Sequence, residues 1–131
     1  MELHLKIISC LLIFLALIHL AFPRFFNWTK EFATLSLINR QMMYVHTFFI
    51  SLVVLLMGLL CLTSPLEIIE TALGKKIALG FGLFWMARLF IQFFIYSSIL
   101  WKGKLFETII HVLFSVCWTY LSIVFLTIYL G

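Results

Sequence analysis

Residues 77–100 read IALGFGLFWMARLFIQFFIYSSIL, an apolar run that carries a single charged side chain, Arg88. A helix needs about 20 mostly apolar residues to cross the hydrocarbon core of a bilayer. Three other runs, 5–22, 42–62 and 108–130, meet the same requirement. The sequence therefore predicts an all-α membrane protein, with four transmembrane helices bundled into one membrane domain over residues 1–131.

The composition also favours lipid as the solvent. Of the 131 residues, 65% are hydrophobic and 11% are charged, whereas a soluble domain is about half apolar and about a quarter charged. A soluble fold of this size could not hide so much apolar surface. The net charge of +4 does not indicate nucleic acid, because the basic residues other than Arg88 lie at the ends of apolar runs, where cationic anchors are expected.

The connections between the runs predict how the helices are joined. Pro23 is expected to end the first helix, since proline cannot continue the hydrogen-bond ladder. We expect that helix to be retained and not cleaved as a signal peptide, because no small-residue cleavage site follows it. Ser64-Pro65 predicts the start of a short helix and Gly74 its end. The short connection at 101–104 predicts that the third and fourth spans are antiparallel neighbours, and Ala78 and Gly82 predict a close helix contact.

The segment between the first two spans is amphipathic. Phe25, Trp28, Phe32 and Leu35 recur at three- and four-residue spacing, which fits a short helix in the membrane interface. A loop with aromatic anchors explains the same pattern equally well. Counting Lys and Arg on each side puts both termini outside the cytoplasm: Arg24, Lys30, Arg40, Lys102 and Lys104 lie on one side, and Lys6, Lys75 and Lys76 on the other.

Arg88 is the most informative residue of the chain. An arginine at the bilayer centre costs about 2.5–3.5 kcal/mol on insertion scales, so it must face the bundle interior, a water-filled cavity or a partner. Trp85, Gln92 and Tyr96 share its face by helical spacing. No Asp or Glu lies in any predicted span. The charge must therefore be met by carbonyls, by neutral side chains, by water or by an anionic group, whose geometry a guanidinium matches.

The histidines of the spans fall at one depth. His19 lies near the end of the first span, and His46 and His111 lie near the starts of the second and fourth. Because helix direction alternates, all three are expected on the same side of the membrane, with Gln92 and Tyr96 in a similar layer. Polar residues also occur near an interface simply because water is close. The alternative is a shared cofactor site made by His19, His46, His111, Arg88, Gln92, Tyr96 and Trp118, with His46 and His111 as metal ligands.

Neutral imidazoles bind haem iron and transition metals well. Haem b or a transition metal is therefore the candidate cofactor, with Trp85 and Trp118 packing the porphyrin. His111-x-x-Phe114-x-x-x-Trp118 resembles, in one helix only, the small membrane b-haem proteins of the CopD-like and HemJ-like groups. Such a resemblance implies a haem-binding role for His111. In those families a small or glycine-containing turn often follows the tryptophan, whereas this chain has Thr119-Tyr120-Leu121 at that place.

Three functions remain open. The first is a subunit of a larger membrane complex or a homo-oligomer, which suits a small chain without a soluble domain. The second is a haem- or metal-binding redox protein that uses His46 and His111. The third is an oligomeric transporter or channel with Arg88 lining an anion path. Walker loops, CxxC pairs and di-iron histidine clusters are missing from the sequence, and whether the chain is an enzyme stays open.

Overall fold

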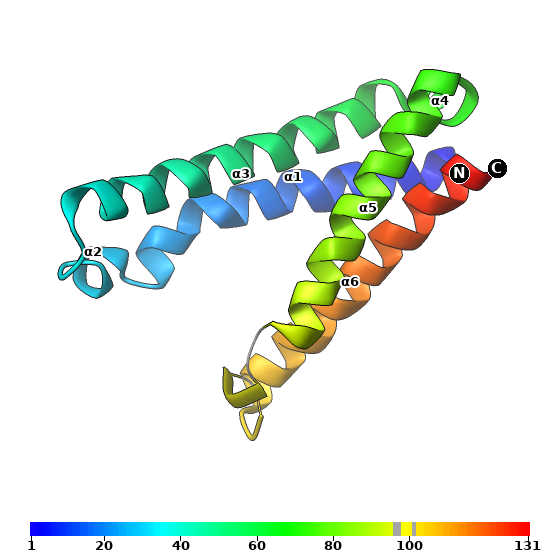
Figure 1. Cartoon of the computed structure of the whole chain (residues 1–131). Helices are drawn as coiled ribbons and strands as arrows, with labels where there is room; N and C mark the ends of the chain where they lie inside the picture. Colours follow the sequence, from blue (N-terminus) through cyan, green and yellow to red (C-terminus); the bar gives the residue numbers. More distant parts are fainter. Residues whose placement is uncertain (96–97, 101) are drawn as a thin grey trace. The chain divides into compact units, whose positions relative to one another are not determined.

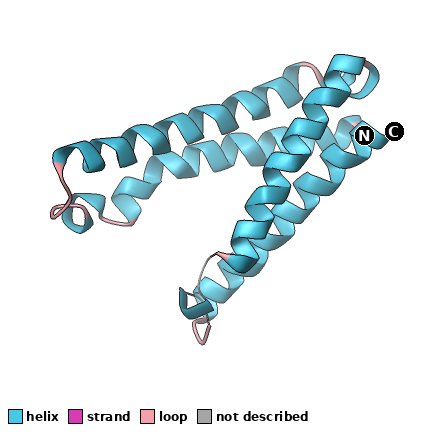
Figure 2. Cartoon of the chain, viewed as in Figure 1, coloured by secondary structure: helices cyan, strands magenta, loops and turns pink. Residues whose placement is uncertain are grey.

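The computed structural model describes residues 1–95, 98–100 and 102–131, and these form helices without any strand (Figure 2). The elements are α1 (Glu2–Phe25), α2 (Trp28–Glu31), α3 (Leu37–Thr63), α4 (Pro65–Glu70), α5 (Ala72–Phe94), the 3-10 turn η1 (Ser98–Leu100) and α6 (Leu105–Leu130). Among the described residues, α1, α3, α5 and α6 are long and apolar enough to cross a membrane. The all-helical class and the four candidate spans are confirmed, in line with a multi-pass integral membrane protein.

The chain divides into two compact units, Glu2–Pro65 and Leu66–Gly131. In the first unit α1 packs along α3, and in the second α5 packs along α6 (Figure 1). Each unit is thus a pair of long helices joined by a short connection. The residues with the strongest chemical interest divide between them, with His19 and His46 in the first unit and Arg88 and His111 in the second.

Small residues bring α1 and α3 together. A Cβ atom built on Gly58 would lie 3.0 Å from Ile13 Cγ1 and 3.2 Å from Leu12 Cβ. Farther along, the Ser51 hydroxyl donates a hydrogen bond of 2.7 Å to the carbonyl of Ala16. The contacts run in opposite order along the two helices. In lipid, close backbone approach and interhelical hydrogen bonds supply the association that the hydrophobic effect cannot.

Ser51→Ala is expected to destabilise this helix pair by about 0.6 kcal/mol, and by no more than about 1.7 kcal/mol, the range for interhelical hydrogen bonds in membranes. The measurement is the unfolding midpoint in mixed detergent micelles. Thr63→Ala is the matched control, because within the described residues the Thr63 hydroxyl bonds to Leu59 of its own helix. Equal midpoints for the two variants would show that the Ser51 bond does not hold α1 to α3.

The predicted contact at Ala78 and Gly82 is confirmed in the second unit. Ala78 is fully buried, and a Cβ atom on Gly82 would lie 2.9 Å from the side chain of Leu126 on α6. The ring of Phe81 packs edge-on against Phe125 at 5.3 Å beside this point. The small residues thus let α5 approach α6 closely, which sets the spacing for the polar side chains one to three turns farther along α5.

Two predicted boundaries are wrong. Pro23 lies inside α1, which continues to Phe25, because a proline removes only its own donor and the Phe26 N–H still bonds to the Phe22 carbonyl at 2.9 Å. The chain turns instead at Asn27, whose φ of 53° is left-handed, a conformation that asparagine tolerates better than most residues. Between α1 and α3 only one turn, α2, is helical, and its place relative to a membrane interface stays a prediction.

Gly74 does not end the short helix that begins at Pro65 as predicted. That helix, α4, ends at Glu70, and Gly74 lies in the first turn of α5. The position requires glycine for steric reasons, because an added Cβ would lie 2.1 Å from the Glu67 carbonyl oxygen. Thr71 caps α5 by accepting the Gly74 N–H at 2.9 Å, which satisfies one of the donors left open at a helix start.

Candidate functional site

The predicted site residues of the second unit lie together. Gln92 and Trp85 are buried on α5, Arg88 is half-buried between them, and His111 and Trp118 face them from α6. The three- and four-residue spacing that predicted a shared face on α5 is therefore confirmed for these members. Tyr96, the fourth predicted member, lies outside the described residues.

Arg88, Gln92 and His111 form a hydrogen-bonded chain, which we call the polar cluster. Arg88 Nη1 donates to Gln92 Oε1 over a long 3.5 Å, and Gln92 Nε2 lies 2.8 Å from His111 Nδ1. Gln92 is only 7% exposed. A buried amide must be hydrogen-bonded to avoid a desolvation penalty, and here its oxygen and its nitrogen are each used by a different partner. Gln92 therefore links the charge on α5 to the imidazole on α6.

The arginine charge fixes the direction of this chain. A guanidinium has donors and no acceptor, so the amide oxygen of Gln92 must face Arg88 and the amide nitrogen must face His111. Nδ1 of a neutral His111 then accepts the bond, and its proton sits on Nε2. A histidine that ligates a metal through Nε2 has the reverse arrangement, with Nδ1–H donating to a neighbour. The polar cluster thus opposes metal ligation by Nε2 of His111.

Aromatic rings pack beside the polar cluster. The rings of Trp85 and Trp118 stack with centroids 5.0 Å apart and planes 11° apart, and Phe114 stacks on Trp118 at 5.5 Å. Arg88 Cζ lies 5.3 Å from the Trp118 ring centroid, within the range of a cation–π contact worth about 0.5–2 kcal/mol. The predicted porphyrin slot does not fit this arrangement, because the ring faces that would hold a porphyrin contact each other.

Two buried donors beside the polar cluster have no acceptor among the described residues. The indole nitrogens of Trp85 and Trp118 are buried without a hydrogen-bond partner among the described residues. The hydroxyl groups of Ser115 and Ser122 donate to carbonyls of their own helix, at 2.7 Å each. Helical spacing could not reveal the unpaired indoles, since their burial depends on how the two tryptophans stack.

His19 and His46 lie on the other unit. His19 Nδ1 is 2.8 Å from the Leu15 carbonyl of its own helix, and its ring packs on Phe22 at 4.8 Å. His46 is exposed on α3. In the described part of the chain, no group of three or more His, Cys, Asp or Glu side chains could hold a metal ion. Because His46 and His111 belong to different units, their shared site stays a prediction.

The hydrogen-bonded chain makes a spectroscopic prediction. We expect His111 in its neutral form to carry its proton on Nε2, because Gln92 donates to Nδ1. Imidazole ¹⁵N chemical shifts distinguish the two tautomers. Gln92→Leu should remove this preference, whereas Phe90→Leu, an exposed change on the same helix, should leave it intact. A wild-type spectrum with the proton on Nδ1 would contradict the assigned direction of the chain.

Comparison of the chain with protein-family models, with curated proteins and with solved structures found no match.

Proposed function

We propose that this chain is an integral membrane protein with four antiparallel spans in one membrane domain, and that it serves as a non-catalytic subunit of a larger membrane complex. The observation that carries the proposal is the setting of Arg88. Its contacts include the neutral amide of Gln92 and the neutral ring of Trp118, and no Asp or Glu lies within the predicted spans. These two contacts orient the guanidinium.

A carboxylate that faces Arg88 within the membrane would have to come from outside the predicted spans of this chain. All five acidic residues lie beyond those spans, at Glu2, Glu31, Glu67, Glu70 and Glu107. A buried charge is tolerated when an opposite charge and further hydrogen bonds meet it. A carboxylate on a helix of the partner would match the planar fork of Arg88. We therefore propose that the α5–α6 pair docks against a partner helix that carries an intramembrane Asp or Glu.

Lysine and arginine counts support an orientation with both termini outside the cytoplasm. This orientation places the α1–α3 connection and the α5–α6 connection on the cytoplasmic side. We propose that α2, with Trp28 and Lys30, lies at that interface, since aromatic and cationic side chains anchor membrane proteins there. Glycosylation-site tagging of each terminus tests the orientation.

The haem and anion-path hypotheses remain predictions with direct tests. A Soret band and bound iron in gently purified protein would establish haem, despite the stacked tryptophans. Chloride flux through liposomes that contain the purified chain would establish a channel. The subunit proposal expects neither signal.

Site-specific photocrosslinking tests the proposed docking side. Phe84 and Phe90 are both exposed phenylalanines of α5, but Phe84 lies four residues before Arg88 and so shares its side of the helix. A photoreactive side chain at position 84 should give a discrete protein adduct in native membranes, and the same probe at position 90 should give lipid adducts. Lipid adducts alone from both positions would overturn the proposal.

A further inference from the structure

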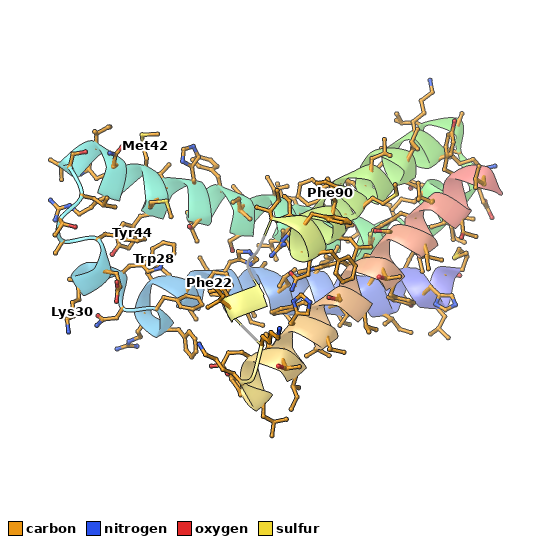
Figure 3. The ribbon with its side chains drawn as sticks, turned by 60° about the horizontal axis from the view of Figure 1, so that its bottom comes forward. Phe22, Trp28, Lys30, Met42, Tyr44 and Phe90 are labelled. Carbon is orange, nitrogen blue, oxygen red and sulfur yellow. The ribbon has the colours of Figure 1, made fainter. Side chains whose placement is uncertain are left out.

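A groove lined by both aromatic and polar side chains lies at the end of the α1–α3 unit, where α2 meets the first turns of α3. It has a volume of about 250 Å³ and is lined by Trp28, Thr29, Leu37, Arg40, Gln41 and Tyr44. Trp28 and Tyr44 point toward one another across the space between α2 and α3, and Lys30 projects from the outer side of the turn (Figure 3). The groove belongs entirely to the first unit and is separate from the polar cluster.

Arg40 is the residue that gives the groove its chemistry. Its Nε is buried and has no hydrogen-bond partner among the described residues. A buried donor on a charged group that lacks an acceptor is costly. Arg40 also has no ion-pair partner in the described part of the chain. The groove therefore holds a positive charge and a buried donor that an anionic acceptor from outside would satisfy.

The other lining residues suit an oxyanion. Thr29 and Tyr44 carry hydroxyls and Gln41 carries an amide, all able to donate. Trp28 and Tyr44 form an aromatic wall, with ring centroids 5.5 Å apart at 72°. Tryptophan and tyrosine gather at the level of lipid headgroups. The groove is smaller than the roughly 300–1,000 Å³ of sites for drug-sized ligands, so it suits a compact group.

We propose that this groove binds the phosphate of a membrane phospholipid headgroup, with Arg40 as the main donor. The groove lies between α2 and the start of α3, a helix long enough to cross a membrane, so it faces the layer where lipid phosphates are concentrated. Guanidinium groups recognise phosphate through two parallel hydrogen bonds, and Nε is one of the donors in that fork. The inference requires that α1 and α3 span the bilayer, and it is independent of any partner at Arg88.

Native mass spectrometry of the delipidated full chain tests the proposal. The probes are phosphatidylglycerol, titrated alone, and inorganic phosphate, added as a competitor. Arg40→Ala should weaken phosphatidylglycerol binding by about tenfold or more, equal to about 1.4 kcal/mol. Arg24→Ala is the matched control, because it removes an exposed arginine from the last turn of α1, in the same unit, and should change binding by no more than about twofold.

Arg40→Lys is the control for misfolding, because it keeps the positive charge and removes only the planar guanidinium fork. We expect it to fold with wild-type helix content and to bind the lipid more weakly than wild type. Equal weakening by Arg24→Ala and Arg40→Ala would overturn the site, as would wild-type binding in Arg40→Lys. Displacement of the lipid by inorganic phosphate at comparable concentration would overturn the lipid assignment and make a soluble phosphate the ligand.

Discussion

Arg88→Leu is expected to reach the membrane at wild-type level or above and to lose the proposed complex. Leucine at a helix centre favours insertion by about 0.3–0.6 kcal/mol, whereas arginine opposes it by about 2.5–3.5 kcal/mol. The partner carboxylate, in contrast, would be left buried and unpaired, which costs about 3–5 kcal/mol. Since 1.4 kcal/mol is about tenfold in an equilibrium constant, the assembled fraction should fall by more than about a hundredfold.

Two further variants sharpen this test. Arg88→Lys should assemble poorly, because a lysine can neither form the two-pronged contact with a carboxylate nor stack on Trp118 in the same way. Phe90→Leu should assemble normally, because Phe90 is exposed on the opposite side of α5. Membrane levels come from immunoblots and assembly from native gels. A complex of unchanged size and amount in Arg88→Leu would exclude the proposed role.

Much of the fold follows from the sequence because lipid imposes a simple requirement. Four long apolar runs predicted α1, α3, α5 and α6, and helical spacing placed Trp85, Arg88 and Gln92 on one face. Both signals depend only on residues near each other in the chain. Helix ends were less predictable. Pro23 and Gly74 are strong local signals, yet neither ends a helix, because the surrounding hydrogen bonds and close contacts decide each case.

The arrangement of the site depends on contacts between helices, which the sequence of a single helix does not specify. Gln92 was expected at a depth similar to that of His111, and the two side chains meet at 2.8 Å. Depth alone did not predict toward which neighbour each side chain points from its helix. His19 bonds to its own helix, and Trp118 stacks on Trp85 instead of lining an open slot. The Arg40 groove was missed because it forms only when α2 folds against α3.

Gly74 lies where α4 folds against the start of α5. A Cβ atom at this position would lie 2.1 Å from the Glu67 carbonyl oxygen and 2.5 Å from Ile68 Cα. Both are backbone atoms, which cannot rotate away as a side chain can. The Thr71 hydroxyl also joins the two segments, since it donates to the Glu67 carbonyl at 2.6 Å and accepts the Gly74 N–H at 2.9 Å. Any added atom must therefore push α4 off α5.

Gly74→Ala is expected to destabilise the second unit by about 3 kcal/mol or more, at the upper end of the range for overpacking a close contact. Gly80→Ala is the matched control on the same helix, because a Cβ there meets nothing within 4 Å. That change should be neutral or should stabilise α5 by about 0.5–1 kcal/mol, the usual advantage of alanine over glycine inside a helix. The free energies of unfolding of both variants in mixed micelles decide the matter. Equal stability of the two variants would mean that α4 does not pack against Gly74.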